Sequence, residues 1–539
     1  MFVLRSVLSR GKLSREDIVG AVALAALVVA AAYHAYQFRT VGSDDSYITF
    51  RHADNLRSLR GMSYNADERV EATSSFLFAV LLAIVMLFGG TPEVWSRILG
   101  GACFCGLVVV TYLFPRRLIS GAGSVLLALG AAGLVAASTH LAYWGASGME
   151  TLLFALLVMI ASYLQTFQKP SWPYVAGLGA LARPEGLALA GVFLLVDWAH
   201  DVVKRRWRVA TRIALRSVGK FLAVYGPVLA FRLLYFGELM PNSVIAKSGF
   251  LEAHKTLSFG DWWHFLGNNP GTSIFLQYVG QWSVGSALAL VALLLWHDRF
   301  ATTFRLVATI VLGFLICVWD EGDWMGWYRL LVPSTAPFAV LVVLGLRTLL
   351  FQVSQRRWGG HLVSHAIALA AMFWLYDKVH VLRRYVNPDA GNNYMQTIAM
   401  GLRDVRRPDD TVAADMIGVL GFYSRMHVID MMGLGTKHIA RYGTRFGSFG
   451  KVDNDYVARQ KPTFYMFHSL DALRLYYGSV SDFAPQRSDY VVVVTPYAKR
   501  AHDPDERVLV VRKDRPDLDQ VRRVFDATFM ELDEYIRSW

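Results

Sequence analysis

Two adjacent carboxylates near the start of the chain, Asp44 and Asp45, are the first residues whose types and spacing could do chemistry. Tyr47 and Arg51 follow, and a helix that begins at Ser43 would place these two side chains on one face, because residues four apart are neighbours on a helix. A carboxylate held at such a site can act as a general base or as a metal ligand. The alternative is structural, with Ser43 as the N-cap and the acids in the first turn.

Ionisable residues also stand at the ends of apolar runs farther along the chain. Glu150 precedes one such run, and Arg183 and Glu185 lie between the short runs 172–182 and 186–198. These two runs predict a hairpin too short for two full crossings, so its tip would lie at depth, where an ionisable residue is costly and functional by default. An acid at a helix start and a local Arg183–Glu185 pair are the structural alternatives.

Two further loops combine polar, charged and aromatic residues. Loop 237–280 contains Asn242 and Lys247. In loop 320–330, aromatic residues stand beside acids and one arginine, which suits a carbohydrate face with a nearby phosphate contact. A plain aromatic belt at the membrane surface is the alternative. The residues of interest in this second loop are Asp323, Trp324, Tyr328 and Arg329.

The elements that must position these residues belong to a membrane protein. Of the 539 residues, 54% are apolar and only 18% are charged, whereas an ordinary soluble chain has roughly 25% charged residues. This composition predicts a polytopic α-helical membrane protein and excludes disorder. Apolar runs near the roughly 20 residues that span a bilayer fall at 18–36, 73–89, 97–114, 122–140, 151–167, 172–182, 186–198, 217–236, 281–297, 303–319, 331–351 and 361–378.

The basic residues predict on which side each loop lies. If 73–89 crossed the membrane fully, the basic clusters around residues 116, 204–220, 299–305 and 356 would all lie outside, against the positive-inside rule. If this run enters and leaves on one side, every cluster lies inside. We therefore predict about eleven spans, a re-entrant or membrane-edge helix at 73–89, and an N-terminus inside. The net charge of +12 is then a topology signal, and no nucleic-acid partner is needed.

The sequence pattern changes after residue 380, where short β-rich runs alternate with charged segments. Tyr490–Thr495 and Val508–Val511 are two such runs, and the pattern is typical of a soluble α/β domain. The predicted organisation is a transmembrane domain over 1–379 and an extracytoplasmic α/β domain over 380–539. The first extracytoplasmic loop, with its membrane-edge helix, covers 37–96.

An ordered set of short motifs resembles a known family. Its motifs are Asp44-Asp45-Ser-Tyr47-Ile-Thr-Phe50-Arg51, Glu68-Arg-Val-Glu71-Ala-Thr73, Ser147-Gly148-Met149-Glu150-Thr151, Ala182-Arg183-Pro184-Glu185-Gly186, Pro241-Asn242 with Lys247, and Gly322-Asp323 with Arg329 to Pro333. The set resembles the first loop and later loops of GT-C glycosyltransferases, which are membrane enzymes that take sugars from polyprenyl-phosphate donors. Within that superfamily it is similar to a bacterial branch that includes the AftB-type arabinofuranosyltransferases and related pilin-glycosylating enzymes.

The resemblance implies a GT-C fold in the bacterial inner membrane, with the active site and the C-terminal domain outside the cytoplasm. The expected reaction moves D-arabinofuranose from a decaprenyl-phosphoarabinose type of donor to a cell-envelope glycan or a pilin-like protein acceptor. Membrane lipid is the other expected partner. A mannosyl- or aminoarabinosyltransferase of the same fold is the runner-up.

The resemblance also implies roles for individual residues. Asp44 would be the catalytic base, and Asp45 would orient the acceptor or, in some relatives, assist a divalent metal such as Mg²⁺ or Mn²⁺. The cations expected at the donor phosphate are Arg183, Lys247 and Arg329. The positions expected to bind sugar or acceptor are Tyr47, Arg51, Glu71, Glu150, Glu185, Asn242, Asp323, Trp324 and Tyr328.

Other classes of membrane protein fit parts of the pattern. A lipid-linked sugar transporter or flippase is also polytopic with buried charge and broken helices, although the chain shows no internal symmetry between halves. A sensor or assembly scaffold would explain the soluble C-terminal part but leaves the acids of the membrane region without a role. We found no P-loop, Rossmann glycine pattern or His-rich metal cluster in the sequence.

Overall fold

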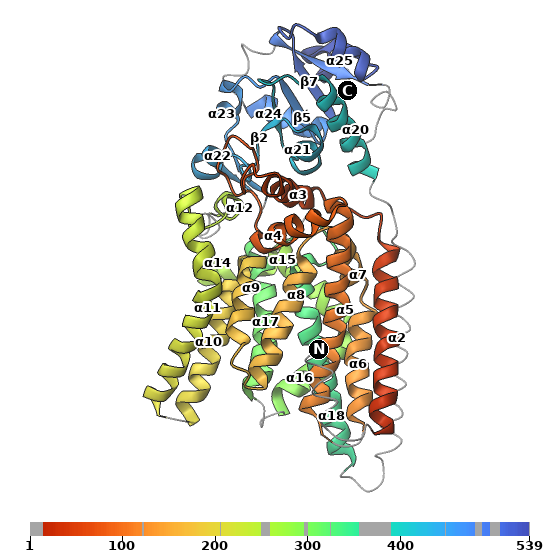
Figure 1. Ribbon diagram of the computed structural model, residues 1–539, viewed down its shortest axis with the longest axis vertical. Coiled ribbons are helices and arrows are strands. Elements are labelled where there is room, and N and C mark those ends of the chain that lie inside the picture. Colours follow the sequence, from red (N-terminus) through yellow and green to blue (C-terminus); the bar gives the residue numbers. More distant parts are fainter. Residues whose placement is uncertain are drawn as a thin grey trace. The chain divides into compact units, whose positions relative to one another are not determined.

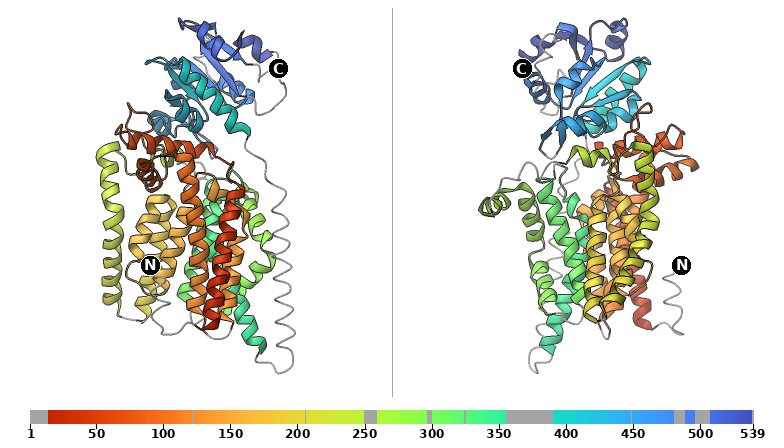
Figure 2. Two further views of the ribbon diagram at one scale, coloured as in Figure 1. Left: turned by 45° about the vertical axis from the view of Figure 1, so that its right-hand side comes forward. Right: turned by 90° about the vertical axis from the view of Figure 1, so that its left-hand side faces the viewer.

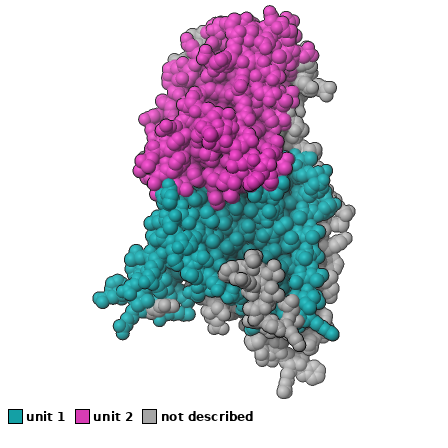
Figure 3. Space-filling model, in the orientation of Figure 1, with its two compact units in different colours: residues 1–41, 96–227, 257–387 teal, residues 42–95, 228–256, 388–539 magenta. Residues whose placement is uncertain are grey.

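The computed structural model describes residues 14–120, 123–204, 206–248, 259–295, 300–323, 325–354, 390–447, 449–479, 488–495 and 507–537. The chain separates into two compact units, which Figure 3 colours differently. Unit 1 comprises residues 1–41, 96–227 and 257–387, and unit 2 comprises residues 42–95, 228–256 and 388–539. The division differs from the sequence-based boundary near 380, because the first loop and residues 228–256 cluster with the C-terminal part.

Unit 1 is helical, and its long helices run alongside one another (Figures 1 and 2). Two helices, α5 and α11, begin or end in unit 2. The helices are α2 (Arg15–Gln37), α5 (Pro92–Leu118), α6 (Ser124–Ala136), α7 (Thr139–Ala146), α8 (Thr151–Thr166), α9 (Trp172–Ala182), α10 (Glu185–Lys204), α11 (Trp207–Phe236), α14 (Phe259–Asn268), α15 (Pro270–Gln281), α16 (Ser283–Leu295), α17 (Phe300–Trp319), the 3₁₀ turn η3 (Arg329–Leu331) and α18 (Val332–Ser354).

Helix lengths confirm a multi-pass membrane protein. Among the described residues, six helical segments are long and apolar enough to cross a bilayer: α2, α5, α10, α11, α17 and η3 with α18. The number rises to eight if the bent pairs α6–α7 and α15–α16 each count as one span. Of the other predicted spans, 151–167 and 172–182 form the shorter helices α8 and α9, and 361–378 lies outside the described residues.

Two expectations about short runs have different outcomes. The run 73–89 forms only α4 (Phe76–Val85) and the 3₁₀ turn η1 (Met86–Phe88), which together are shorter than the helices that pass the length test. Its re-entrant or membrane-edge placement stays a prediction. The run 186–198 was predicted to be half of a hairpin too short for two crossings, and this prediction is wrong for its second half. Helix α10 is 20 residues long and passes the length test, because it begins at Glu185 and continues past the apolar run to Lys204.

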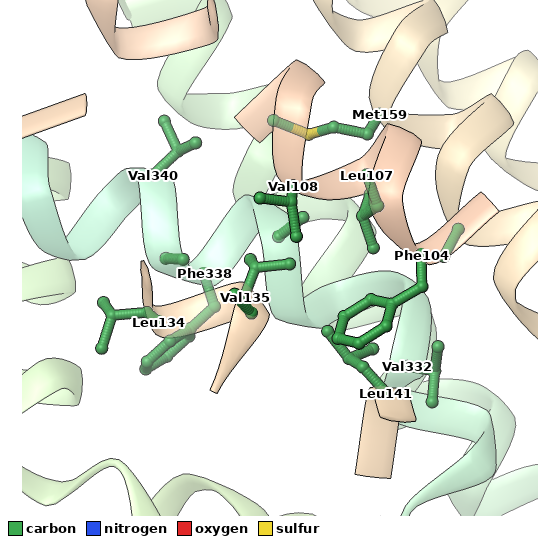
Figure 4. Close-up of a cluster of buried hydrophobic side chains, with 14 of the residues drawn as sticks. Phe104, Leu107, Val108, Leu134, Val135, Leu141, Met159, Val332, Phe338 and Val340 are labelled. Atoms are coloured by element: carbon green, nitrogen blue, oxygen red, sulfur yellow. The ribbon is translucent and has the colours of Figure 1, made fainter. Parts of the chain in front are cut away.

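The core of unit 1 forms where α18 packs against α6, α8, α16 and α17. Figure 4 shows Phe104, Leu107 and Val108 of α5 converging with Val135 of α6 and Phe338 of α18. Close packing of such large apolar side chains stabilises helix association through many small dispersion contacts, and it holds the polar ends of these helices at fixed positions.

Unit 2 combines two stretches of the membrane region with the α/β domain. The predicted β-runs form β6 and β7, which confirms an α/β domain in this part of the chain. Its elements are α3 (Asp44–Arg57), α4, η1, α12 (Asn242–Ala246), α20 (Ala390–Val405), β1 (Thr411–Ala414), α21 (Gly418–Ser424), β2 (His427–Asp430), α22 (Lys437–Tyr442), β3 (Thr444–Phe446), β4 (Gly450–Val452), α23 (Asn454–Arg459), β5 (Phe464–Phe467), α24 (Leu470–Ser479), β6 (Tyr490–Val494), β7 (Val508–Arg512), α25 (Leu518–Val524), β8 (Thr528–Glu531) and α26 (Leu532–Arg537).

The main sheet of unit 2 has six strands in the order β2-β1-β5-β7-β6-β8. Strands β2, β1 and β5 are parallel, and the remaining neighbours are antiparallel. Four of its strands, β1, β5, β6 and β7, are nearly continuous apolar runs, as expected for strands that are covered on both faces. Helix α3 packs against α21, the helix that follows β1, and also against α4.

Candidate functional site

The candidate base, Asp44, is the first residue of α3, and its carboxylate is bound by the start of another helix. Oδ2 accepts the Gly418 N–H at 2.9 Å and Oδ1 accepts the Val419 N–H at 2.8 Å. The predicted helix start is confirmed, since Ser43 is the N-cap residue, although its side chain makes no capping hydrogen bond. A Cβ added at Gly418 would lie 1.8 Å from the Asp44 carbonyl oxygen. Only glycine at position 418 therefore permits this approach.

The surroundings of Asp44 favour a carboxyl group that can exchange its proton near neutrality. Asp44 is only 6% exposed. Burial raises the pKa of its carboxyl to about 6, the Val419 N–H opposes this rise, and the neighbouring Asp45 carboxylate adds to it. Asp45 itself is half-buried. A base whose pKa lies close to the working pH can accept a proton and return it to solvent, which general-base catalysis requires.

Tyr47 and Arg51 lie on the same face of α3, as predicted, but both side chains contact other residues of unit 2. The Tyr47 ring lies 5.0 Å from Phe50 and 5.6 Å from Phe422, measured between ring centroids. Arg51 donates to the carbonyl oxygens of Tyr64, Gly421 and Met426 at 2.7–2.8 Å. The buried guanidinium thus joins the first loop to α21, which favours a positioning role over sugar binding.

Glu71 has a partner that the sequence did not suggest. Arg232 of α11 binds both carboxylate oxygens, at 2.8 and 2.9 Å, and the two side chains are only 2% and 3% exposed. This bidentate pair fixes the end of the first loop to α11, so the geometry favours a structural role for Glu71. An arginine inside the apolar run 217–236 was the available signal, because a buried charge in such a run needs a partner.

Asn242 and Lys247 lie at the two ends of the short helix α12. Asn242 Nδ2 donates to the carbonyl oxygens of Gly433 and Leu434, at 2.8 and 2.9 Å. Its Oδ1 is buried without a hydrogen-bond partner in the described part of the chain. Lys247 is the half-buried C-cap residue of the same helix.

In unit 1, Arg183 joins two carboxylates that are distant in the sequence from each other. It pairs with Glu150 at 2.9 Å and with Glu185 at 2.8 Å. The local Arg183–Glu185 pair is therefore present, and Glu150 joins it. Because the arginine ends α9 while the acids begin α8 and α10, the three side chains connect the ends of three helices.

A second ion pair of unit 1 lies in the loop before η3. Arg329 pairs with Asp323 at 3.1 Å. The Asp323 side chain is 1% exposed, and among the described residues its Oδ2 has no hydrogen-bond partner. Tyr328 adopts a left-handed conformation with φ of 53° and accepts a hydrogen bond from Gln281. Strained backbone of this kind is often found at ligand sites. The remaining candidate of this loop, Trp324, lies outside the described residues.

Arg183, Glu185 and Arg329 line one cavity of unit 1, where about 380 Å³ of space, part of it open to solvent, lies between the side chains. Its other walls are mostly apolar and are formed by Phe154, Leu189, Leu312, Ile316, Leu330 and Pro333, with Thr151, Thr309, Gly313 and Ser334. A wholly apolar cavity of about 230 Å³ between α8, α9 and α10 shares Phe154 and Leu189 with it. The two arginines are each paired with a carboxylate, but a guanidinium has five N–H donors. Arginines beside continuous apolar surface therefore suit an amphiphile with an anionic head.

The sequence-predicted residues thus form two groups. Unit 1 brings together Arg183, Glu150 and Glu185, and it joins Arg329 to Asp323. The candidates of unit 2 are Asp44, Asp45, Tyr47, Arg51, Glu71, Asn242 and Lys247.

Sequence reasoning also missed a His–Asp pair at the carboxyl edge of the parallel strands. Asp415 follows β1 and His468 follows β5, and the two adjacent strands bring them together. His468 Nδ1 lies 2.7 Å from Asp415 Oδ2, and the His468 N–H donates to Oδ1 of the same carboxylate at 3.1 Å. Pairing of β1 with β5 creates this contact, so no local sequence pattern could have indicated it.

Among the residues that the structure describes, those around Asp44 do not form a metal site. Both of its oxygens accept amide N–H groups, and within the described ranges no group of three or more His, Cys, Asp or Glu side chains is placed to hold an ion. Hard divalent cations take six or more oxygen ligands, several of them carboxylates or waters. The described residues around Asp44 therefore do not fit a divalent cation.

One family model matches the C-terminal part of the chain. It is described as a domain of unknown function, DUF8728, and covers residues 384–511.

Two curated relatives are both named terminal β-(1→2)-arabinofuranosyltransferase. The protein from Mycobacterium tuberculosis is 27% identical over 245 residues, which is 42% of this chain and 38% of the relative. The protein from Corynebacterium glutamicum is 27% identical over 393 residues, which is 62% of this chain and 52% of the relative. The chain therefore matches about half or less of the length of these relatives.

Solved structures show a similar fold at low sequence identity. ArnT from Cupriavidus metallidurans bound to undecaprenyl phosphate superposes with a TM-score of 0.53 and 14% identity, covering 92% of this chain and 98% of ArnT. The oligosaccharyltransferase of Archaeoglobus fulgidus tethered to an acceptor peptide gives a TM-score of 0.52 and 13% identity, covering 88% of this chain and 73% of that one. Both neighbours are GT-C membrane glycosyltransferases.

Proposed function

We propose that this chain, a multi-pass membrane protein with the GT-C fold, is a glycosyltransferase that moves a sugar from a polyprenyl-phosphate donor to a cell-envelope glycan or protein acceptor. The proposed sugar is D-arabinofuranose. The proposal rests on the GT-C fold, on the two relatives named arabinofuranosyltransferases, and on the chemistry of the cavity in unit 1.

The single observation that carries the proposal is that two arginines line a largely apolar cavity among membrane helices. Arg183 and Arg329 both border it, beside walls such as Phe154 and Leu189. A polyprenyl phosphate has matching parts, since its phosphate needs cationic donors and its lipid chain needs apolar surface. The structural neighbour ArnT is itself bound to undecaprenyl phosphate.

In the proposed reaction, Asp44 is the base, and Arg183 and Arg329 bind the leaving phosphate. A hydroxyl oxygen of the acceptor attacks the anomeric carbon and forms the new C–O bond, its proton passes to the Asp44 carboxylate, and the bond from the anomeric carbon to the phosphate oxygen breaks. The polyprenyl phosphate leaves with the bonding electrons, and Arg183 and Arg329 stabilise its negative charge. Asp45, which is more exposed than Asp44, orients the acceptor hydroxyl.

Sugar hydroxyls need polar partners as well. Asp323 is the strongest candidate, because its Oδ2 has no hydrogen-bond partner among the described residues and a sugar O–H would supply one. Glu150 and Glu185, held by Arg183, offer further carboxylate oxygens.

The proposal is tested with the purified full chain in nanodiscs and radiolabelled decaprenyl-phosphoarabinose. We expect label to move to a cell-envelope glycan acceptor, and loss of envelope pentose in a deletion strain should accompany it. Decaprenyl-phosphomannose and a polyprenyl-phosphoaminoarabinose are the competing donors. Transfer from only one of these competing donors would contradict arabinose as the sugar but support a glycosyltransferase. Transfer from none of the three donors would contradict the proposed enzyme class.

A further inference from the structure

Thr151 lines the same cavity as Arg183 and Arg329 but has no role among the residues that the sequence singled out. It is the first residue of α8, directly after Glu150, and it is only 1% exposed. Within the described residues its Oγ1 is buried and has no hydrogen-bond partner. Because Thr151 is the first residue of α8, this helix has no carbonyl three or four residues back to accept the hydroxyl.

Such a hydroxyl destabilises the protein when nothing is bound. A buried hydroxyl without a partner loses its hydrogen bonds to water and gains nothing in return. Threonine in a helix divides between two χ1 rotamers, so a change of rotamer can turn Oγ1 toward a ligand in the cavity that the residue borders. A ligand oxygen placed there would remove the penalty.

The chemistry of the neighbouring side chains indicates which ligand oxygen this is. Arg183 and Arg329 line the same cavity together with Glu185. Glu150, Glu185 and Asp323 pair with the two arginines, but a guanidinium has five N–H donors and can bind a further anionic oxygen. A hydroxyl donates one hydrogen bond, and bonds to charged acceptors are stronger than neutral ones. Phosphate offers several acceptor oxygens, and one can bind the hydroxyl while others bind the arginines.

We infer that Thr151 Oγ1 donates a hydrogen bond to a phosphate oxygen of the lipid-linked donor, beside Arg183 and Arg329. This inference rests on the proposed function and adds to it an uncharged hydrogen-bond donor that positions the phosphate. Thr151 therefore acts on donor binding, and the free protein gains no stability from its hydroxyl.

The test measures binding of undecaprenyl phosphate to the purified full chain, together with the thermal unfolding temperature of the free protein. Thr151→Val removes the hydroxyl and keeps the volume, and Thr151→Ser keeps the hydroxyl. Thr166→Val is the matched control, since Thr166 ends the same helix and its buried hydroxyl also lacks a partner among the described residues, but it does not line the cavity.

We expect Thr151→Val to weaken binding about tenfold or more, the range for a hydrogen bond to a charged group, while the Tm of the free protein stays equal or rises. Thr151→Ser and Thr166→Val should bind like the wild type. Inorganic phosphate is the second probe: if it binds as tightly as the lipid and responds equally to Thr151→Val, the ligand is free phosphate, and the lipid-donor form of the inference is overturned.

Two results would overturn the inference while leaving the proposed donor site standing. One is wild-type affinity of Thr151→Val for undecaprenyl phosphate, and the other is a Tm loss in this variant that explains its weaker binding. If the wild type itself does not bind undecaprenyl phosphate, both the inference and the proposed donor are wrong.

Discussion

The Asp44 carboxylate and the Val419 backbone N–H are hydrogen-bonded at 2.8 Å although 375 residues of chain separate them. The Gly418 N–H donates to the same carboxylate. Asp44, the first residue of α3, therefore accepts hydrogen bonds from the first two backbone amides of α21. The proposed base is therefore also a structural link within unit 2, and substitutions of Asp44 act on both properties.

Asp44→Asn is expected to abolish transfer and also to lower stability. Loss of the proton acceptor removes general-base catalysis, typically about 10²–10⁴-fold. An asparagine has one acceptor oxygen, so its NH₂ group would face one of the two amide N–H groups that the carboxylate now satisfies. Labelled-sugar transfer and thermal unfolding measure the two effects. Asp67→Asn, an exposed site paired with His427, is the control; normal transfer by Asp44→Asn would return this residue to a purely structural role.

The pH dependence of activity and stability should have opposite signs. Because the base must be ionised, kcat/KM is expected to fall as the pH drops through about 6, the raised pKa of Asp44. Since this folded-state pKa lies above the ordinary value of 3.8, protonation favours the folded state: the stabilisation is complete below the unfolded pKa and is lost as the pH rises through 6.

A comparison of the wild type with Asp44→Asn from pH 4.5 to 7.5 isolates this contribution. Burial also raises the pKa of Asp430 to about 7 and lowers that of His52 to about 4, but both effects are common to the two proteins. An activity profile with its acid limb near pH 4 would contradict the assignment of Asp44.

The Glu71–Arg232 pair is expected to matter for stability. Glu71→Ala leaves the Arg232 charge buried without its partner, which typically costs about 3–5 kcal/mol. The double variant Glu71→Met/Arg232→Met should recover most of that loss, because it removes both charges. Chemical unfolding of the two single variants and the double variant in detergent gives the coupling free energy. If Glu71 binds the acceptor instead, Glu71→Gln should raise the acceptor KM with little change in stability.

Arg329→Lys is expected to weaken undecaprenyl-phosphate binding about tenfold and to reduce turnover as well. Lysine keeps the charge but loses the planar fork that binds phosphate and Asp323 together, and the phosphate is charged in both the ground and transition states. Arg305→Lys is the matched control in unit 1, since Arg305 pairs with Asp197 at 2.8 Å and does not line the cavity. Equal affinities of the two variants would exclude Arg329 from the donor site.

The basic clusters predict that the short α10–α11 connection lies in the cytoplasm and that the α/β domain lies outside. An alkaline phosphatase fused after residue 539 is expected to be active in bacterial cells, because this enzyme folds only where disulfides form. A fusion within the α10–α11 connection should be inactive. An inactive C-terminal fusion would refute the predicted topology and the membrane-edge assignment of 73–89.

The sequence by itself determined the class of protein and the start of its candidate site. Apolar runs of near-spanning length indicated most of the long helices, and Ser43 with two acids indicated the beginning of α3, because bilayer thickness and helix capping act over a few consecutive residues. Strands β6 and β7 were visible for the same reason.

Only the tertiary structure decided which polar groups meet. Arg232 reaches Glu71 across 161 residues, Asp415 meets His468 only through pairing of β1 with β5, and the Thr151 hydroxyl is left without a partner in the described structure by the packing around it. A polar residue is compatible with many local sequences. Its hydrogen-bond or ion-pair partner is determined on folding, because burial removes water and makes an unsatisfied charge or hydroxyl costly. That selection depends on chain segments brought together by folding, which local periodicity does not encode.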